Sequence, residues 1–343
     1  MTRILFFEQS SWEAEYLKKE LSGHELIFVE RKLDAHVAGD EHAEIISIFV
    51  GSSISPEVLK KFPRLRMIAT QSTGFDHIDL AACAQRGIIV SNVPTYGART
   101  VAEYTFTLLL ALTRKLLPAV ERVRTQYSFS LDGLRGSDLY RKTFGCIGCG
   151  HIGQEAMKIA NGFSMKVVAY DVAPKPELAR ELNFRYVALE ELLALSDVIS
   201  LHVPYNAGTH HLLNADNMKK IKRGAVLVNT ARGPVVDTAV LFELLENGTV
   251  AAAGLDVLEE EGAIKEEREL VVHGQPDQQR LRTVLQNHLL IRMPNVIVTP
   301  HNAFNTDEAL LEIVRTTVEN IRAFLSGRPQ NVVGKLPQAA ASD

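Results

Sequence analysis

Short apolar runs rich in β-branched residues alternate with amphipathic stretches along most of the chain. In the first hundred residues, strands are predicted at 4–7 and 45–50, and helices at 12–21 and 79–85. Consecutive parallel strands need a crossover connection, usually a helix, so this alternation predicts parallel sheets with helices on both faces. The alternation restarts after Arg141, which predicts an α/β protein of two doubly wound, Rossmann-like domains with a cleft between them.

From Thr100 onward the chain contains a long helix and a charged segment as well as further strands and helices. A long helix is predicted to begin at Thr100, because Thr100 and Glu103 have the spacing of a capping box, and to end or kink at Pro118. Residues 262–293 are highly charged and helical in character, which indicates a surface insertion. Strands are predicted at 166–170, 198–201, 225–229, 251–255 and 296–299, and helices at 154–160, 238–246 and 308–325.

Composition excludes several classes of function. The chain has 343 residues, which suits two domains better than one core. Lys and Arg total 37 against 41 Asp and Glu, a formal charge of −4, so there is no electrostatic footprint for nucleic acid or an anionic membrane. The N-terminus lacks a signal-peptide pattern, and three cysteines favour a reducing compartment over a disulfide framework. We therefore expect a cytoplasmic protein with no nucleic-acid or membrane partner.

A glycine pattern follows the apolar strand that precedes residue 148. Its three glycines allow a tight turn, close approach of backbone to a pyrophosphate, and close packing of the next helix. Asp171 ends the following strand, where a carboxylate can accept both ribose hydroxyls and would repel a 2′-phosphate. No arginine follows in residues 172–176, so NAD is favoured over NADP. The alternative is an ordinary glycine-rich turn with a surface Asp. The cofactor residues predicted here are Gly148, Gly150, His151, Ile152, Gly153 and Asp171.

Cys146 and Cys149 form a C-x-x-C pattern within this turn. Redox or metal chemistry would require a thioredoxin-like helix or a second pair of ligands, and the sequence has neither. We therefore expect no metal site.

Polar residues follow three strands of the second half, where active sites of open α/β sheets lie. Arg232 follows strand 225–229, acidic residues follow strand 251–255, and His301 follows strand 296–299. A guanidinium can pair with a substrate carboxylate, an imidazole can exchange a proton with a carbonyl oxygen, and a carboxylate can orient that imidazole. Each residue alone also fits a surface role, but together with a dinucleotide turn they favour hydride transfer at a carbonyl or carbinol carbon. The candidate carboxylates are Asp256, Glu259, Glu260 and Glu261.

Four segments resemble the D-isomer-specific 2-hydroxyacid dehydrogenase family, and the resemblance extends over nearly the full chain. It implies that Arg232 orients substrate, that His301 is the acid/base, and that Glu261, five residues after Asp256, is its carboxylate partner. The chain departs from the family at Gly262, where a proline is usual. The matching segments are 148–153, 227–237 (Leu-Val-Asn-Thr-Ala-Arg-Gly-Pro-Val-Val-Asp), 254–261 (Gly-Leu-Asp-Val-Leu-Glu-Glu-Glu) and 295–301 (Asn-Val-Ile-Val-Thr-Pro-His).

The resemblance also implies a domain division and further site residues. It assigns residues 1–99 and 302–343 to a flavodoxin-like substrate domain and residues 100–301 to a Rossmann domain that binds NAD. Backbone amides of Ser72, Thr73 and Gly74 would bind the substrate carboxylate, and Tyr96 would lie on the substrate side. The further cofactor residues that it implies are Val203, Pro204, Thr209, Thr230, Ala231 and Asp256.

The segment after the histidine bears on the choice of substrate. Its sequence, Asn302-Ala-Phe304, resembles that of D-lactate enzymes, and a Phe would line the pocket with apolar surface. Pyruvate and D-lactate are therefore favoured, with hydroxypyruvate, glyoxylate or phosphoglycerate as alternatives. A dinucleotide-sensing corepressor on the same scaffold is an alternative of a different class. The family further implies a homodimer, for which residues 100–117 are a candidate contact.

Overall fold

The computed structural model describes residues 1–261 and 278–334. The chain divides into two compact units, the first formed by Met1–Tyr96 together with the chain from Thr306 onward, and the second by Gly97–Asn305. Each unit is built on one parallel sheet, of five and of seven strands, which confirms the predicted fold class. Within the described residues, no helix combines the length and apolar character that a membrane span requires.

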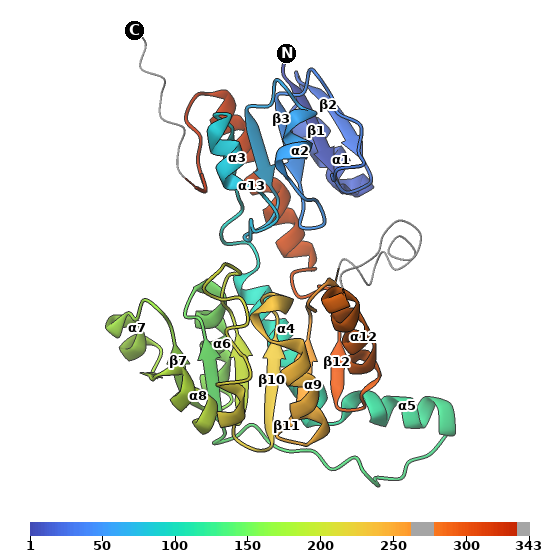
Figure 1. The fold of residues 1–343 in the computed structure, drawn as a ribbon, viewed down its shortest axis with the longest axis vertical. Coiled ribbons are helices and arrows are strands. Elements are labelled where there is room, and N and C mark those ends of the chain that lie inside the picture. The colour runs from blue at the N-terminus through green and yellow to red at the C-terminus, as the bar shows by residue number, and fades with distance from the viewer. Residues whose placement is uncertain (262–277, 335–343) are drawn as a thin grey trace. The chain divides into compact units, whose positions relative to one another are not determined.

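Unit 1 is a five-stranded parallel sheet in the order β2-β1-β3-β4-β5 (Figure 1). Helices α1 (Ser11–Glu20) and α13 (Asp307–Leu325) contribute Leu17, Val314 and Val318 to the core on one face, and α2 (Pro56–Lys60) and α3 (Leu80–Gln85) cover the other. Helix α13, from the C-terminal part of the described residues, therefore completes the first unit. The strands are β1 (Arg3–Phe7), β2 (Glu25–Val29), β3 (Ile45–Ile48), β4 (Met67–Thr70) and β5 (Ile89–Ser91).

Unit 2 is a seven-stranded parallel sheet in the order β12-β11-β10-β9-β6-β7-β8, with helices on both faces. Helices α4 (Ala98–Thr113) and α6 (His151–Gly162) pack on one face, while α8 (Leu189–Leu195), α9 (Thr238–Glu246) and α12 (Gln278–Arg292) contribute to the core on the other. The strand order reverses between β6 and β9, which is where such sheets bind ligands. The strands are β6 (Thr143–Ile147), β7 (Lys166–Tyr170), β8 (Arg185–Tyr186), β9 (Val198–Leu201), β10 (Ala225–Asn229), β11 (Val250–Leu255) and β12 (Val296–Val298).

The predicted start of the long helix at Thr100 was wrong. Helix α4 begins at Ala98 after Gly97, and no side chain caps its first turn. Glu103 does not reach back to a free amide but pairs with the guanidinium of Arg99 at 3.2 Å on an exposed surface. The helix had already begun when the chain reached Thr100, so a capping box at that position has no end to cap.

The predicted end or kink at Pro118 was also misplaced. Helix α4 ends at Thr113, and Lys115, with a φ of 54°, turns the chain into a separate helix, α5 (Leu116–Gln126). Pro118 lies in the first turn of α5, where a backbone N–H has no partner within the helix and its loss costs little. Of the predicted insertion, residues 262–277 lie outside the described residues, and the remainder forms α12.

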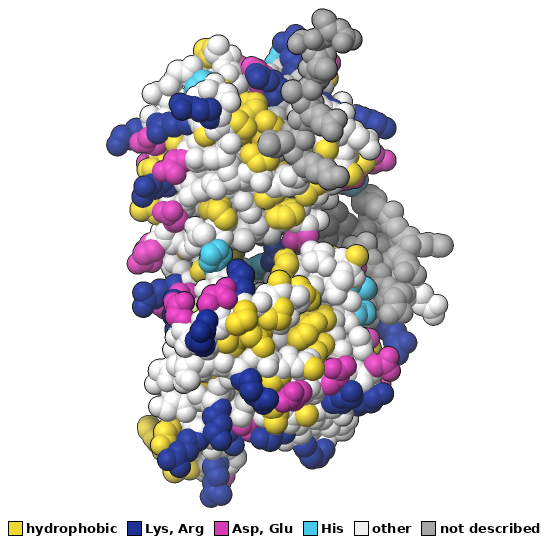
Figure 2. Space-filling view, turned by 90° about the vertical axis from the view of Figure 1, so that its left-hand side faces the viewer, with side chains coloured by type: hydrophobic (Ala, Val, Ile, Leu, Met, Phe, Trp, Pro, Cys, Tyr) yellow, Lys and Arg dark blue, Asp and Glu magenta, His cyan; other side chains and the backbone are white. Residues whose placement is uncertain are grey.

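Both signs of charge are spread over the face of the molecule shown in Figure 2. Lys and Arg side chains are interspersed with Asp and Glu side chains there. This mixture accords with a formal charge of only −4.

Candidate active site

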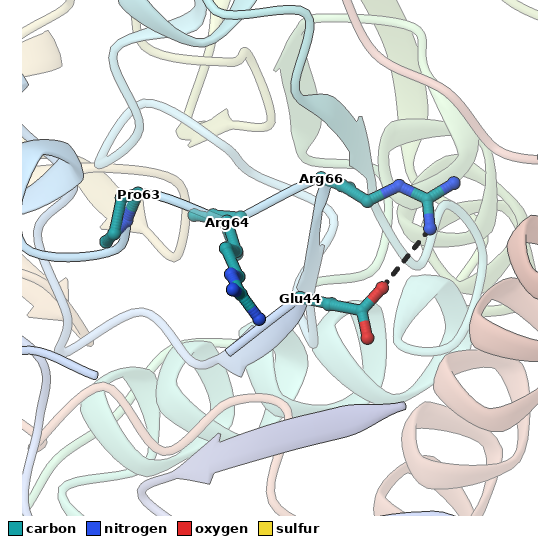
Figure 3. A pocket seen from close by; sticks show the side chains of 5 residues that line it. Glu44, Pro63, Arg64 and Arg66 are labelled. Atoms are coloured by element: carbon teal, nitrogen blue, oxygen red, sulfur yellow. Dashed lines mark hydrogen bonds and ion pairs between the residues drawn. The ribbon is translucent and has the colours of Figure 1, made fainter. Parts of the chain in front are cut away.

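A shallow hollow in unit 1 lies before the amino ends of β3 and β4 and is lined in part by Glu44, Arg64 and Arg66 (Figure 3). Its Arg66–Glu44 pair, 3.3 Å apart, has an exposed guanidinium. Open parallel sheets bind ligands at the opposite edge, outside the carboxyl ends of the strands. The hollow is therefore not the candidate site.

The glycine turn, residues 148–153, connects β6 to α6. Gly148 has a φ of +96°, and a Cβ on Gly153 would come within 2.0 Å of the carbonyl oxygen of Gly148. Gly150, in contrast, has nothing within 4 Å of the position its Cβ would take. The turn is thus close-packed toward the protein and open at the start of α6, where His151 and Ile152 present first-turn amides. This combination suits a bound pyrophosphate.

Asp171 follows β7 and is tied to the glycine turn. One carboxylate oxygen accepts a hydrogen bond from the backbone N–H of Cys149 at 2.7 Å, and the other accepts one from Ala173 at 2.8 Å. A carboxylate can accept about four hydrogen bonds, so Asp171 keeps acceptor capacity for two hydroxyl groups.

Both cysteines of the C-x-x-C pattern are buried free thiols. Burial raises the pKa of Cys149 to about 11 and raises that of Cys146 well above its usual value, which disfavours the reactive thiolate. Among the described residues, no group of three His, Cys, Asp or Glu side chains could hold a metal ion.

The segment after β9 lies against the glycine turn. A Cβ on Gly148 would meet the carbonyl oxygen of His202 at 2.6 Å and a methyl group of Val203 at 2.9 Å. Beyond the exposed Pro204, the Thr209 hydroxyl closes the chain reversal, because it accepts from the N–H of Asn206 at 2.8 Å and donates to the Pro204 carbonyl at 2.7 Å. The predicted cofactor residues Val203, Pro204 and Thr209 therefore belong to one ordered turn.

The sequence prediction missed His202. Its Nε2 is hydrogen-bonded to the Ser200 hydroxyl at 2.9 Å, and its Nδ1 is buried with no hydrogen-bond partner in the described part of the chain. Burial lowers the pKa of this imidazole to about 4. A histidine directly after a strand, beside the glycine turn, is the sequence signal that could have identified it.

Arg232 lies in the arginine loop, residues 229–233, at the carboxyl end of β10. The Asn229 side chain shapes this loop, because it accepts from the N–H of Ala231 at 3.0 Å and donates to the carbonyl of Arg232 at 2.9 Å. The Thr230 hydroxyl is hydrogen-bonded to the Thr105 hydroxyl of α4 at 3.0 Å, which joins the arginine loop to that helix.

His301 lies in the histidine loop, residues 299–303, in a left-handed backbone conformation with a φ of 56°. Such a conformation is strained for a residue with a Cβ and requires support from its surroundings. Asp256 supplies it. This carboxylate is 1% exposed and accepts hydrogen bonds from the Thr299 hydroxyl at 2.5 Å and from the N–H groups of Asn302 and Ala303 at 2.8 Å. Burial raises the pKa of Asp256, and these hydrogen bonds oppose that rise.

Asp256 therefore has extensive contacts that its predicted place in the cofactor site did not anticipate. Both of its oxygens accept hydrogen bonds from the histidine loop. The structure thus gives Asp256 a supporting position behind His301.

Glu261 is the member of the acidic run that contacts His301. Its Oε1 lies 3.0 Å from Nδ1 of His301. Because a carboxylate only accepts, this contact places the proton of the neutral imidazole on Nδ1 and leaves Nε2 for proton exchange. The Glu261 and His301 side chains are 36% and 18% exposed, so the pair is accessible to a small reactant.

Unit 1 holds the residues that were predicted on the substrate side. Ser72, Thr73 and Gly74 follow β4, where the Ser72 hydroxyl donates to the carbonyl of Gly74 at 2.6 Å and the Thr73 hydroxyl donates to that of Val93 at 2.8 Å. The loop is thus held in one conformation by its own side chains. Tyr96 is the last residue of this part of the unit and is half-buried.

The chain is similar to known proteins over most of its length. Residues 106–303 match the family model described as D-isomer specific 2-hydroxyacid dehydrogenase, NAD binding domain. A 2-hydroxyacid dehydrogenase homologue of Zymomonas mobilis is 36% identical over 332 residues, which cover 95% of this chain and 98% of the relative. A D-lactate dehydrogenase of Aquifex aeolicus, solved with NAD and lactic acid, has a TM-score of 0.85 and 37% identity, covering 95% of this chain and 96% of its own. A glyoxylate reductase of Korarchaeum cryptofilum is 32% identical over 331 residues, or 95% of this chain and 91% of the relative.

The chain belongs to the D-isomer-specific 2-hydroxyacid dehydrogenase family. This confirms the resemblance, the enzyme class and the NAD cofactor that were predicted from the sequence. The residues present fit that cofactor, because the glycine turn leaves open space at Gly150, which a Cβ would occupy, beside the free amides of the α6 N-terminus. Of the other predicted cofactor residues, Asp171 and Val203 lie directly against this turn.

Proposed function

We propose that this NAD-dependent D-2-hydroxyacid dehydrogenase interconverts pyruvate and D-lactate. The observation that carries the proposed chemistry is the His301–Glu261 pair, 3.0 Å apart and partly exposed, at the same sheet edge as Arg232. Support for the substrate comes from Phe304, three residues after His301, since an aromatic side chain favours a short apolar group over a phosphate. The similarity to a D-lactate dehydrogenase solved with lactic acid supports the same choice.

Each proposed catalytic residue has one task. NADH, when bound, supplies the hydride. Arg232 pairs its guanidinium with the substrate carboxylate and polarises the neighbouring carbonyl. His301 donates a proton from Nε2 to the carbonyl oxygen during reduction and accepts it during oxidation, a contribution of roughly 10²–10⁴-fold. Glu261 stabilises the protonated imidazole and holds it by Nδ1.

The remaining predicted residues are proposed to bind rather than to react. In unit 1, the loop of Ser72, Thr73 and Gly74 binds the substrate carboxylate through its amides, and Tyr96 contacts the substrate. In unit 2, the proposed cofactor contacts are Gly148, Gly150, His151, Ile152, Gly153, Asp171, Val203, Pro204, Thr209, Thr230, Ala231 and Asp256.

A panel of 2-oxo acids tests the substrate. NADH oxidation is measured with pyruvate, hydroxypyruvate, glyoxylate and 2-oxoisocaproate, and kcat/KM is expected to be highest for pyruvate. A higher kcat/KM for hydroxypyruvate or glyoxylate would contradict pyruvate as the substrate and favour the alternative of a hydroxypyruvate or glyoxylate reductase. Tight NADH binding without turnover of any of these acids would favour the dinucleotide sensor.

We also propose that the enzyme is a cytoplasmic homodimer, in keeping with its buried free thiols. Of the predicted contact at residues 100–117, we retain only the last two residues, because the apolar side chains of α4 are largely buried within unit 2. Helix α5 instead has no buried residue, and its apolar side chains continue into an exposed segment. A face this apolar suits an isologous contact with a second copy. Its residues are Leu116, Leu117, Val120, Val123, Tyr127, Phe129 and Leu131.

Light scattering coupled to gel filtration tests this contact. The wild-type chain is expected at twice its mass of 37.9 kDa, and Leu116→Asp combined with Phe129→Asp at the mass of one chain. A monomeric wild-type protein would contradict the proposed dimer.

A further inference from the structure

A second pair of a carboxylate and an imidazole lies two residues before Glu261. Oε1 of Glu259 accepts a hydrogen bond from Nε2 of His211 at 3.0 Å, and its Oε2 accepts one from the Thr238 hydroxyl at 2.9 Å. The Glu259 side chain is 16% exposed, which is less than half the exposure of Glu261. The side chain of Glu259 thus contacts His211 and Thr238, whereas that of Glu261 contacts His301.

The partners of Glu259 come from three different segments of unit 2. His211 ends the turn that follows β9, Thr238 begins α9, and Asn287 in α12 donates its side-chain amide to the Glu259 backbone carbonyl at 2.6 Å. The turn carrying His211 is also the turn that contains Pro204 and Thr209. Glu259 thus joins the turn beside the proposed cofactor site to the segment that carries Glu261.

The arginine loop is packed against the same segment. A Cβ on Gly233, the residue after Arg232, would lie 2.0 Å from the carbonyl carbon of Leu258 and 2.2 Å from the nitrogen of Glu259. The backbone that leads to Arg232 and the backbone that leads to Glu261 are therefore in direct contact at Glu259. A displacement of Glu259 would change both positions.

The backbone between Glu259 and Glu261 is strained. Glu260 has a φ of 56°, the left-handed conformation that residues with a Cβ rarely adopt. Such a residue persists only where its surroundings hold it. The residue before Glu260 is held in place, because both side-chain oxygens and the backbone carbonyl of Glu259 accept hydrogen bonds. Glu261 then reaches His301 at 3.0 Å.

We propose that Glu259 and His211 form a positioning pair for the catalytic carboxylate Glu261. The pair holds the strained turn at Glu260 so that Glu261 stays within hydrogen-bond distance of His301. It acts through Glu261 and does not touch the reacting atoms. This inference rests on the proposed acid/base function of His301 and Glu261.

A double-variant cycle tests whether the pair acts through Glu261. Steady-state kinetics with NADH and pyruvate are measured for Glu259→Gln, Glu261→Gln and the double variant. We expect Glu259→Gln to lower kcat by roughly 10-fold, as loss of an orienting partner typically does. The dissociation constant for NADH and the melting temperature should stay close to wild type. In the Glu261→Gln background, the same Glu259→Gln change should lower kcat no further.

A second variant and a control complete the test. His211→Gln should reproduce the loss of kcat if Glu259→Gln fails to fold. Glu319→Gln makes the same chemical change in an exposed ion pair of α13, 3.2 Å from Arg315, and should leave kcat unchanged. The proposal would be overturned if the fold-loss of kcat in the double variant equalled the product of the fold-losses in the two single variants. A kcat within twofold of wild type in both Glu259→Gln and His211→Gln would also overturn it.

A readout without turnover separates this inference from the proposed function. The imidazole ¹⁵N resonances of His301, assigned by comparison with His301→Gln, should change in Glu259→Gln and in Glu261→Gln. Unchanged His301 resonances in Glu259→Gln would overturn the positioning pair. Absence of wild-type turnover with every 2-oxo acid, with the resonances changed as expected, would overturn the proposed function but support the positioning of Glu261 against His301.

Discussion

The glycine turn and the catalytic edge, which comprises the arginine loop, residues 256–261 and the histidine loop, belong to the same seven-stranded sheet but are built from different parts of the chain. The glycine turn depends on backbone: Gly148 and Gly153 allow contacts that no Cβ would permit, and the start of α6 offers free amides. The catalytic edge depends on side chains, since Asp256 and Glu259 hold loops that carry His301 and Glu261.

The two regions also tolerate left-handed backbone differently. The glycine turn places Gly148 at a φ of +96°, which costs glycine little. The catalytic edge places His301 and Glu260 at a φ of 56°, although both carry side chains. A carboxylate stands beside each of these strained residues: the buried Asp256 beside His301 and the half-buried Glu259 beside Glu260. The glycine turn, which is built from backbone, should therefore be disturbed most by substitutions that add volume. The catalytic edge, which is built from side chains, should be disturbed most by substitutions that remove hydrogen bonds or charge.

The largest effect is expected at the reactive end of the side-chain network. His301→Ala removes the proposed proton donor and should lower kcat by roughly 10²–10⁴-fold. The dissociation constant for NADH, measured by fluorescence titration, should change little, because the imidazole is not part of the glycine turn. His42→Ala, at an exposed position in unit 1, is the matched control. A kcat close to wild type would show that His301 is not the proton donor.

The next effect is expected in the backbone-built region. Gly153→Ala places a Cβ 2.0 Å from the carbonyl oxygen of Gly148, so the turn and α6 must move apart. We expect a loss of about 3 kcal/mol in the free energy of unfolding and a large loss of NADH affinity. Gly162→Ala, in the same helix and with nothing within 4 Å of its Cβ, should be neutral or slightly stabilising. Equal stability of the two variants in urea denaturation would contradict the close packing of the turn.

A smaller effect, on stability against pH, is expected at His202, whose backbone carbonyl lies against Gly148 of the glycine turn. Burial lowers the pKa of this imidazole to about 4, whereas an unfolded histidine titrates near 6.5. Between these values the unfolded chain takes up a proton that the folded chain does not, so stability falls as pH drops from about 6.5 to 4. The shift corresponds to up to about 3 kcal/mol. In urea denaturation across this range, the free energy of unfolding of His202→Gln should depend less on pH than that of wild type. An equal pH dependence would show that His202 does not keep a lowered pKa in the folded protein.

The same contrast explains what could be predicted from the sequence. The strands at 166–170, 198–201 and 225–229 and the glycine turn were predicted with their boundaries, because a hydrophobic pattern and three glycines are local signals. The choice of Glu261 over Glu259 came from family spacing, since three consecutive glutamates look alike in sequence. Their different partners depend on His211, 48 positions before Glu259, and on His301, 40 positions after Glu261.

Two errors have a related cause. The pattern of Thr100 and Glu103 was read as a helix start, although the backbone had already become helical at Ala98. The support that Asp256 gives to the histidine loop was missed, because the bonds to Asn302 and Ala303 span 46 and 47 positions. Local patterns thus identify elements and candidate reactive residues, while the side chains that hold those residues in place are set by tertiary contacts.

The smallest effect is expected where a side chain serves the backbone-built region. Asp171→Ala removes the carboxylate that accepts from the N–H of Cys149 at 2.7 Å and is proposed to accept the ribose hydroxyls. We expect the dissociation constant for NADH to rise about 10-fold, or about 1.4 kcal/mol, which is close to the value of one hydrogen bond to a charged group. NADPH, which the carboxylate repels, should lose less or gain, so the ratio of kcat/KM for NADPH to that for NADH should rise. Asp132→Ala, at an exposed position, is the control. If both cofactors weakened equally, Asp171 would serve only to hold the turn, and the discrimination against a 2′-phosphate would have to come from another residue.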